Sequence, residues 1–179
     1  SLISYKPTLQ TGYYYGYSHS EDSINATIFY KSIVLQPTQE SPTAKATFQI
    51  NGAFEIFRAY VGIGDKCEAC DDNSTVDGAT MSEYVWNGTA APQLLPSAAN
   101  AMCGHNPSWV SIDIKNADWL RLQVEAKGNV LCDIALYGDP EVCYSSGSNT
   151  SCKTECEYRW TEETKCQLDP ECLWDDNNE

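Results

Sequence analysis

The sequence predicts an all-β protein: an antiparallel β-sandwich of the jelly-roll type over residues 12–142, followed by a small disulfide-rich tail. Three observations support this fold class. Apolar and polar residues alternate in several short segments, as they do in strands with one buried face. Turn-forming residues separate these segments at close intervals. After Val142 the alternation stops, and five of the nine cysteines follow.

The stretch from Thr47 to Asp65 contains two of the predicted strands. Phe48 and Ile50 alternate with polar neighbours, and Asn51-Gly52 after them is typical of a hairpin turn. The alternation changes phase at Phe57, because one extra residue separates the two apolar patterns. An extra residue in a strand is what a β-bulge adds, so we expect a bent central strand here.

The N-terminal third supplies an extension and two further segments. Residues 1–11 are polar, and Tyr13–Tyr17 form a short aromatic strand. This strand either pairs inside its own sandwich or packs against another molecule. Residues 24–35 are rich in β-branched side chains and predict one strand. Its Ile24, Ala26 and Ile28 share one face, which leaves Asn25 on the solvent side.

The second half of the sandwich contains the clearest alternation. A short strand over 81–86 ends at an Asn87-Gly88 turn, and residues 90–107 are expected to be irregular. Segments 110–114 and 120–126 predict a hairpin, and 130–136 predicts a closing strand. We expect the following apolar residues of these segments to be buried: Phe57, Val61, Ile112, Leu120, Leu122 and Ile134.

The tail, residues 143–179, has nine acidic and three basic residues and lacks apolar patterning at its start. Residues 145–151 predict a flexible, glycosylated linker. Residues 155–168 allow one short helix. So short a segment cannot fold on apolar burial alone, so we expect at least two disulfides within it.

Charge and cysteine content restrict the environment of the protein. The net charge of −14 argues against binding nucleic acid or anionic membranes. No apolar run reaches the roughly 20 residues that a membrane-spanning helix needs, so membrane insertion is not expected. Nine cysteines and four Asn-x-Ser/Thr sequons are typical of a secreted or cell-surface glycoprotein.

These residues give two sets of predicted modification sites. The N-glycosylation candidates are Asn25, Asn73, Asn87 and Asn149. The disulfide candidates are Cys67, Cys70, Cys103, Cys132, Cys143, Cys152, Cys156, Cys166 and Cys172. Nine cysteines cannot all pair within one chain, so one is either free or bonded across an interface.

Residues 12–142 resemble the NPCBM family, the "novel putative carbohydrate-binding module", whose members are related to galactose-binding-like sandwiches. The resemblance rests on the Phe-x-x-Phe-x-Ala-x-Val-Gly-Ile pattern of residues 54–63, on Asp65, and on segments 110–114 and 117–124. It implies a galactose-binding-like β-sandwich that binds glycans. The family often has an Asp-His-Ala-Asp-Trp-Ala strand, and here residues 131–137 keep Asp133 and Ala135 but lack the His and Trp.

The sequence contains two candidate metal sites, and no other cofactor is expected. Related sandwiches often carry a structural calcium ion, and Asp65, Asp71, Asp72 and Asp77 are candidate oxygen ligands. The alternative is a solvated acidic loop. Cys67, Cys70, Cys103 and His105 have the residue types of a zinc site, but disulfides are the favoured interpretation of secreted cysteines.

Catalysis has little support in the sequence, because neither His19 nor His105 lies in a catalytic motif. A carboxylate pair of the glycosidase type stays open, since its spacing is spatial, but a non-enzymatic protein is expected. The favoured hypothesis is a structural building block of an extracellular coat or filament. In it, the N-terminal strand would pair with a copy of the chain or with another extracellular glycoprotein. The alternative is a carbohydrate-binding module with flat side chains that stack on sugars: Tyr60, Tyr84, Trp86, Trp109 and Trp119.

Overall fold

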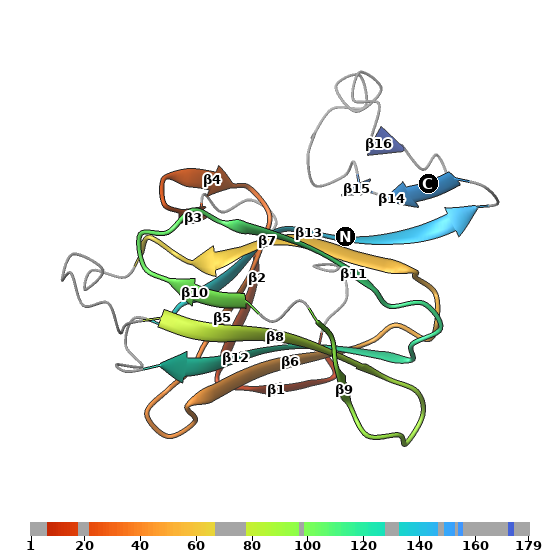
Figure 1. Cartoon of the computed structure of the whole chain (residues 1–179), viewed down its shortest axis with the longest axis horizontal. Helices are drawn as coiled ribbons and strands as arrows, with labels where there is room; N and C mark the ends of the chain where they lie inside the picture. Colours follow the sequence, from red (N-terminus) through yellow and green to blue (C-terminus); the bar gives the residue numbers. More distant parts are fainter. Residues whose placement is uncertain are drawn as a thin grey trace, which may run out of the picture.

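The computed structural model describes residues 7–17, 22–66, 78–96, 99–127, 133–146, 149–152, 154–155 and 172–173. In these residues every regular element is a strand, and the two main sheets face each other as the layers of a sandwich (Figure 1). The predicted all-β class and antiparallel sandwich are confirmed. Among the described residues no helix is long and apolar enough to cross a membrane.

The first layer, sheet A, has the strand order β1-β6-β12-β8-β10, with β9 also pairing β8. All its pairs are antiparallel. Its strands are β1 (Leu9–Thr11), β6 (Thr43–Gln49), β8 (Gly78–Trp86), β9 (Gln93–Leu94), β10 (Ala99–Met102) and β12 (Trp119–Lys127).

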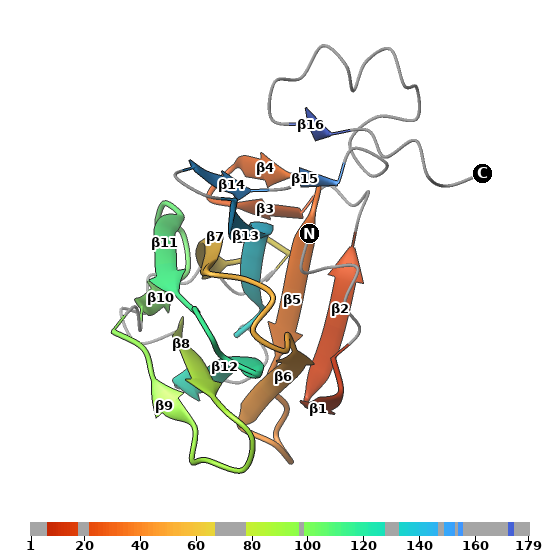
Figure 2. The same ribbon diagram turned by 90° about the vertical axis from the view of Figure 1, so that its right-hand side faces the viewer.

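The second layer, sheet B, has the order β11-β7-β13-β5-β2, with β14 also pairing β13 (Figure 2). These pairs are antiparallel too. Its strands are β2 (Tyr13–Tyr17), β5 (Ser32–Gln36), β7 (Ile56–Ile63), β11 (Ser108–Asp113), β13 (Ala135–Ser146) and β14 (Asn149–Cys152). Two small sheets complete the fold: β3 (Asp22–Ile24) with β4 (Thr27–Phe29), and β15 (Thr154–Glu155) with β16 (Cys172–Leu173).

Alternating residues of the two sheets form the core between them. Along β12, Leu120, Leu122 and Val124 are fully buried, while the residues between them remain partly exposed. Five of the six predicted core residues are buried: Phe57, Val61, Ile112, Leu120 and Leu122. Ile134 is only partly buried, because it lies on the outer side of sheet B against a second, smaller apolar cluster.

The core also contains a polar pair contributed by both sheets. Tyr137 of β13 is completely buried and lies beside the buried carboxyl of Glu83 from β8. Burial raises the pKa of the Tyr137 phenol well above its ordinary value, and the nearby charge of Glu83 adds to this effect.

The predicted hairpins are wrong, because neighbouring strands in the sequence cross between the layers. The Asn51-Gly52 turn exists, with positive φ at both residues, but it leads from β6 in sheet A to β7 in sheet B. The turn over 115–118 likewise connects β11 in sheet B to β12 in sheet A. Alternation records only that a strand has one buried face. It does not distinguish pairing with the next strand from crossing to the opposite sheet.

The phase change at Phe57 therefore marks a crossing and not a bulge. Residues 53–55 belong to no strand, and Phe48 and Phe57 reach the same core from opposite layers. The irregularity in strand pairing lies elsewhere, in β13, where the register with β7 shifts between Gly138 and Glu141.

The N-terminal strands complete the chain's own sheets, which corrects the strand-exchange hypothesis. β1 pairs with β6, and β2 pairs with β5. Gly12, at a φ of 70°, separates the two strands. A Cβ at this position would lie 2.8 Å from Ala44 Cβ, so glycine permits the chain to pass between the layers here.

Residues 24–35 form a hairpin and a strand where a single strand was predicted. The chain reverses at Asn25 and Ala26, both at positive φ, so that β3 and β4 pair over the outer face of sheet B (Figures 1 and 2). Ile28 consequently faces solvent with 52% of its surface exposed, whereas Ile24 is buried.

Two glycines of sheet B allow the β3–β4 hairpin to pack closely on it. A Cβ at Gly62 would lie 2.6 Å from Ile24, and one at Gly138 would lie 2.4 Å from the ring of Phe29. Both positions therefore require glycine for this packing. Ile24 and Phe29 form the second apolar cluster together with Val34 and Leu136.

The predictions for residues 78–107 are partly correct. The predicted Asn87-Gly88 turn is present and joins β8 to β9 in a hairpin, but β9 and β10 both lie within the range expected to be irregular. The predicted linker is wrong where the chain is described, since β13 extends to Ser146 and pairs with β14. Most of residues 153–179 lies outside the described residues, including 156–168 of the predicted helix, whose first residue, Glu155, belongs to β15.

Candidate functional site

A row of aromatic side chains crosses the outer face of sheet B. Phe29 lies over Gly138, its ring centroid is 5.6 Å from that of Tyr60, and Tyr60 is 4.6 Å from Trp109. Exposure increases along the row, from 2% for Phe29 to 38% for Tyr60 and 49% for Trp109. The row thus begins under the hairpin and ends on β11, the edge strand of the sheet.

Strand pairing explains why Tyr60 and Trp109 meet. They are directly opposite partners in the β7–β11 ladder, and both side chains point outward because Ala59, Val61 and Val110 point into the core. The adjacent pair on the same face is Arg58 and Ser111. A guanidinium and a hydroxyl therefore stand one step along the strands from the two rings.

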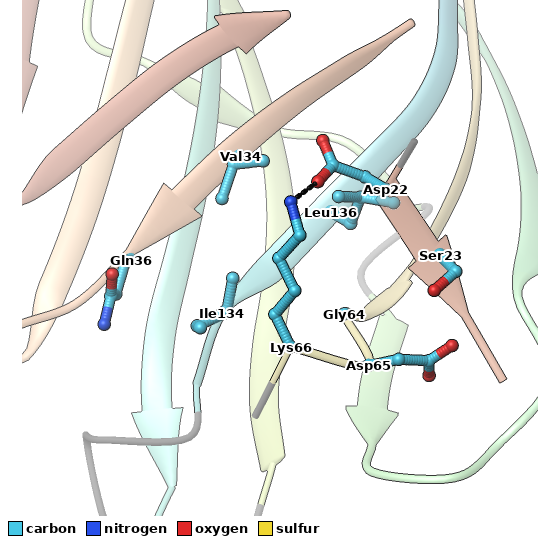
Figure 3. A pocket seen from close by; sticks show the side chains of 9 residues that line it. All are labelled: Asp22, Ser23, Val34, Gln36, Gly64, Asp65, Lys66, Ile134 and Leu136. Atoms are coloured by element: carbon cyan, nitrogen blue, oxygen red, sulfur yellow. Dashed lines mark hydrogen bonds and ion pairs between the residues drawn. The ribbon is translucent and has the colours of Figure 1, made fainter. Parts of the chain in front are cut away.

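A small pocket lies on the same outer face, on the β3 side of the hairpin. It has a volume of about 140 Å³. Its apolar lining is Val34, Leu136 and Ile134, and its polar lining includes Gln36 of β5 (Figure 3). The remaining lining residues are Asp22, Ser23, Gly64, Asp65 and Lys66.

One end of the pocket is closed by an ion pair. The Lys66 ammonium donates to Asp22 Oδ1 at 2.6 Å, and the Ser32 hydroxyl donates to Asp22 Oδ2. The Asp22 side chain is buried, so it holds the exposed side chain of Lys66 across the pocket (Figure 3). The same contacts fix the start of β3 to β5.

Asp65 holds the other end of the β3–β4 hairpin. Its two carboxylate oxygens accept the backbone N–H groups of Asn25 and Ala26 at 2.7 and 2.8 Å. Burial acts to raise the pKa of Asp65, but the hydrogen bonds from Ala26, Ser23 and Asn25 outweigh it, so the pKa lies below 3.8. Both carboxylate oxygens of Asp65 thus hold the backbone of the β3–β4 turn in place.

The other three predicted stacking residues lie on the opposite side of the molecule, on the outer face of sheet A. Trp86 and Trp119 are opposite partners in the β8–β12 ladder, with centroids 5.9 Å apart and ring planes only 8° from parallel. Arg121 lies 4.9 Å above the ring of Trp86 and donates to Thr47 Oγ1. Tyr84, opposite Arg121, is half-buried on this face.

The structure thus divides the five predicted stacking residues into two separate pairs and Tyr84. Sequence reasoning missed the pocket entirely. Its residues come from four segments, at 22–23, 34–36, 64–66 and 134–136, and only the fold brings them together. Gln36, Lys66 and Ile134 carried no motif that would have marked them.

The calcium hypothesis stays untested for most of its residues, because Asp71, Asp72 and Asp77 lie outside the described residues. Within the described part, no group of three or more His, Cys, Asp or Glu side chains could hold a metal ion. Cys67 and Cys70 of the alternative zinc site are likewise not described, and Cys103 is disulfide-bonded.

The modification sites are only partly visible. Cys143 is disulfide-bonded and lies opposite Cys152 in the β13–β14 ladder. Asn25 and Asn87 are exposed in turns, and the Asn25 amide donates to Asn106 Oδ1 at 2.7 Å. Asn149 begins β14, and Asn73 lies outside the described residues. The remaining pairings and the glycosylation of all four asparagines stay predictions.

No protein-family model and no curated protein matches this sequence. Solved structures do match it. The CBM51-2 and INT domains of ZmpB from Clostridium perfringens, in complex with GlcNAc, share 16% identity over 79% of the chain, with a TM-score of 0.59. The CBM51 of Clostridium perfringens GH95, in complex with methyl-galactose, shares 14% identity over 79%, with a TM-score of 0.58.

A third similar structure contains the tandem CBM51 modules of Sp3GH98, the family 98 glycoside hydrolase from Streptococcus pneumoniae SP3-BS71. It shares 15% identity over 75% of the chain, with a TM-score of 0.55. The chain spans 97% of the GH95 module but only 30% and 37% of the ZmpB and Sp3GH98 structures.

These comparisons correct the favoured functional hypothesis. The interpretation as a self-associating building block of a coat or filament is wrong: the similar structures are carbohydrate-binding modules, which favour the alternative instead. The strands expected to join a neighbouring molecule are moreover paired within the chain. The predicted resemblance holds at the level of structure, and the chain has the galactose-binding-like β-sandwich fold of the CBM51 carbohydrate-binding modules.

Proposed function

We propose that the protein is a non-enzymatic carbohydrate-binding module that acts outside the cell and binds glycans on the outer face of sheet B. The observation that carries this proposal is the exposed Tyr60–Trp109 pair at the edge of that face. The fold shared with CBM51 modules supports the ligand class, and the cysteine content supports the location.

The chemistry of the pair suits a sugar ring. An aromatic ring has a negative face that attracts the slightly positive C–H groups on one side of a pyranose, and it offers apolar contact area at the same time. The two rings are tilted by 57°, so they form a shallow corner and not a single plane. Arg58 and Ser111 stand beside this corner and supply donors for the sugar hydroxyls.

The pair is also the most suitable aromatic surface by exposure. Trp109 is the more exposed of the two, with 49% of its surface accessible on an edge strand. Ile28 and Tyr30 of the neighbouring hairpin are exposed as well. Exposed apolar side chains gathered on one face mark an interaction site more often than isolated ones do.

The test is a binding screen of the whole protein against immobilised glycans, followed by titration. Ligands carrying terminal GlcNAc or galactose come first, because the similar modules were solved with these sugars. Trp109→Ala is expected to weaken binding at least about tenfold, since a central aromatic anchor dominates such contacts. Thermal unfolding checks that the variant remains folded.

Trp86→Ala is the matched control, because it removes the same kind of side chain from the opposite sheet. It is expected to leave glycan binding unchanged. If Trp86→Ala abolishes binding and Trp109→Ala does not, the proposed surface is wrong. If the wild-type protein binds no glycan in the screen, the proposed function itself is wrong.

A further inference from the structure

We propose that the pocket beside the β3–β4 hairpin is a second ligand site, separate from the Tyr60–Trp109 surface, and that it takes one neutral sugar ring. This inference rests on the proposed glycan-binding function, which it extends with a second site on the same face. The site consists of the apolar floor of Val34, Leu136 and Ile134, the Gln36 amide, and the Asp22–Lys66 ion pair.

The size of the pocket selects a single ring. Pockets for larger organic ligands occupy about 300–1,000 Å³, whereas a cavity of about 150 Å³ accommodates a ring of the size of benzene. At about 140 Å³ the pocket belongs to the second class. A hexose has twice as many heavy atoms as benzene, so the pocket can hold the ring of one monosaccharide, or of the terminal residue of a chain, with its outer hydroxyl groups left in solvent.

The lining has the amphipathic character that a sugar ring requires. Val34, Leu136 and Ile134 present aliphatic side chains, which suit the C–H face of a pyranose. Gln36 lies on the other side of Ile134 from Lys66 (Figure 3). Its amide carries both a donor and an acceptor, so it can bond to a hydroxyl in either sense.

The charges around the pocket select a neutral ligand. Two carboxylates, Asp22 and Asp65, line it together with one ammonium, that of Lys66, which leaves one net negative charge. The low pKa of Asp65 keeps that carboxylate ionised at neutral pH. A sugar acid would meet this charge at short range and be repelled.

The position of the pocket separates it from the aromatic pair. Ile24 and Phe29 of the hairpin lie over Gly62 and Gly138, between the pocket lining and Tyr60. The hairpin is held there by Asp22 at one end and Asp65 at the other. A single ring in the pocket therefore does not also stack on Trp109, and the two sites can be tested independently.

The experiment titrates sugars into the whole protein, whose Ile, Leu and Val methyl groups are isotopically labelled. Nuclear magnetic resonance records the methyl signals at each sugar concentration. The probes are galactose and N-acetylglucosamine as neutral sugars, and glucuronic acid and N-acetylneuraminic acid as acidic ones. We expect saturable shifts of the Val34, Ile134 and Leu136 methyl signals with a neutral sugar. The acidic sugars are expected to bind more weakly, on the order of tenfold.

Two variants test the assignment. Ile134→Trp fills the pocket from its partly exposed rim and is expected to abolish the shifts at Val34 and Leu136. Gln36→Ala leaves the apolar floor intact and is expected to weaken the pocket's affinity roughly three- to tenfold. Trp109→Ala is expected to leave the pocket titration unchanged. The backbone spectrum of each variant confirms that it is folded.

The outcomes separate this inference from the proposed function. If the pocket methyl signals do not respond while Trp109→Ala abolishes glycan binding, the pocket proposal is wrong and the proposed function remains. If they respond and Trp109→Ala has no effect on glycan binding, the pocket is the sugar site and the Tyr60–Trp109 surface is not. Shifts that persist in Ile134→Trp, or equal affinity for acidic sugars, would overturn the proposal.

Discussion

The two outer faces of the sandwich each carry a pair of aromatic side chains on opposite strand positions, but the surroundings of the pairs differ. On sheet A, Trp86 and Trp119 are stacked nearly parallel, and Arg121 lies over Trp86 and is itself fixed to Thr47. On sheet B, Tyr60 and Trp109 are tilted, and Trp109 occupies an edge strand with half of its surface exposed.

The same residue types therefore have different surroundings on the two faces. In the sheet A pair, the ring faces contact partners within the chain, and these contacts stabilise the folded sheet. The sheet B pair is supported from one side by Phe29 and keeps contact area open on the other. The two pairs have similar numbers and types of aromatic residues. They differ in the orientation of their rings and in the exposed fraction of their surfaces.

Phe29→Ala is expected to have the largest effect on stability, because it removes the buried end of the sheet B row. Phe29 is 2% exposed and packs on Gly138 and Tyr60. Truncating such a residue costs about 3–5 kcal/mol. Thermal unfolding and hydrogen exchange should show the loss first in the β3–β4 hairpin. Equal loss of protection in β8 and β12 would contradict a separate contribution of this cluster.

Gly138→Leu disturbs the same contact from the sheet B side. It is expected to lower the free energy of unfolding by about 1–3 kcal/mol. The new side chain would occupy the space of the Phe29 ring, which lies 2.4 Å from a Cβ at this position. Chemical denaturation measures the change. Gly64→Ala is the control, since its Cβ would meet neighbours only at 3.6 Å or more. If both variants are equally stable, the close packing of the hairpin is not needed.

The two aromatic pairs should lose different amounts of stability on truncation. Trp86→Ala is expected to lower the free energy of unfolding by about 1–2 kcal/mol, from the lost ring pair and the lost cation–π contact. Trp109→Ala is expected to cost less stability, because half of its surface is already exposed. Denaturation curves of the two variants, recorded side by side, decide this point. A larger loss for Trp109→Ala would mean that the sheet B pair is structural as well.

Acid is expected to destabilise the β3–β4 hairpin, and this is the smallest of the effects predicted here. The pKa of Asp65 in the folded protein lies below 3.8, so its contribution is present above that pH and is lost as the pH falls through the folded value. The protection factors of the Asn25 and Ala26 amides, which compare their exchange with the intrinsic rate at each pH, should fall as the pH is lowered from 5 to 3. In Asp65→Asn this dependence should disappear, and its persistence would assign it to another group.

The sandwich itself could be predicted from the sequence, because burial of one strand face leaves a direct record in the alternation of residues. Leu120, Leu122 and Val124 illustrate this, since all three are fully buried. The pairing could not be predicted in the same way. Segments 110–114 and 120–126 alternate equally well whether they form a hairpin or, as here, lie in opposite sheets.

The candidate site was predictable only as a list of residue types. Tyr60 and Trp109 were identified as stacking candidates, but so were Trp86 and Trp119, and only strand register shows which of them meet. Gln36 and Ile134 belong to distant segments that the pairing of β13 with β5 brings together. Such contacts depend on non-local topology, and no local pattern records them.

Strand β13 has a mechanical consequence for how sheet B continues into β14. Its twelve residues span about 40 Å. They extend from the pocket at Leu136, past Gly138 under the hairpin, to Cys143 opposite β14. The chain is thus a continuous, paired strand at the start of the segment where a flexible linker was predicted. A continuous strand fixes the direction in which β14 leaves sheet B, whereas a flexible linker would leave that direction free.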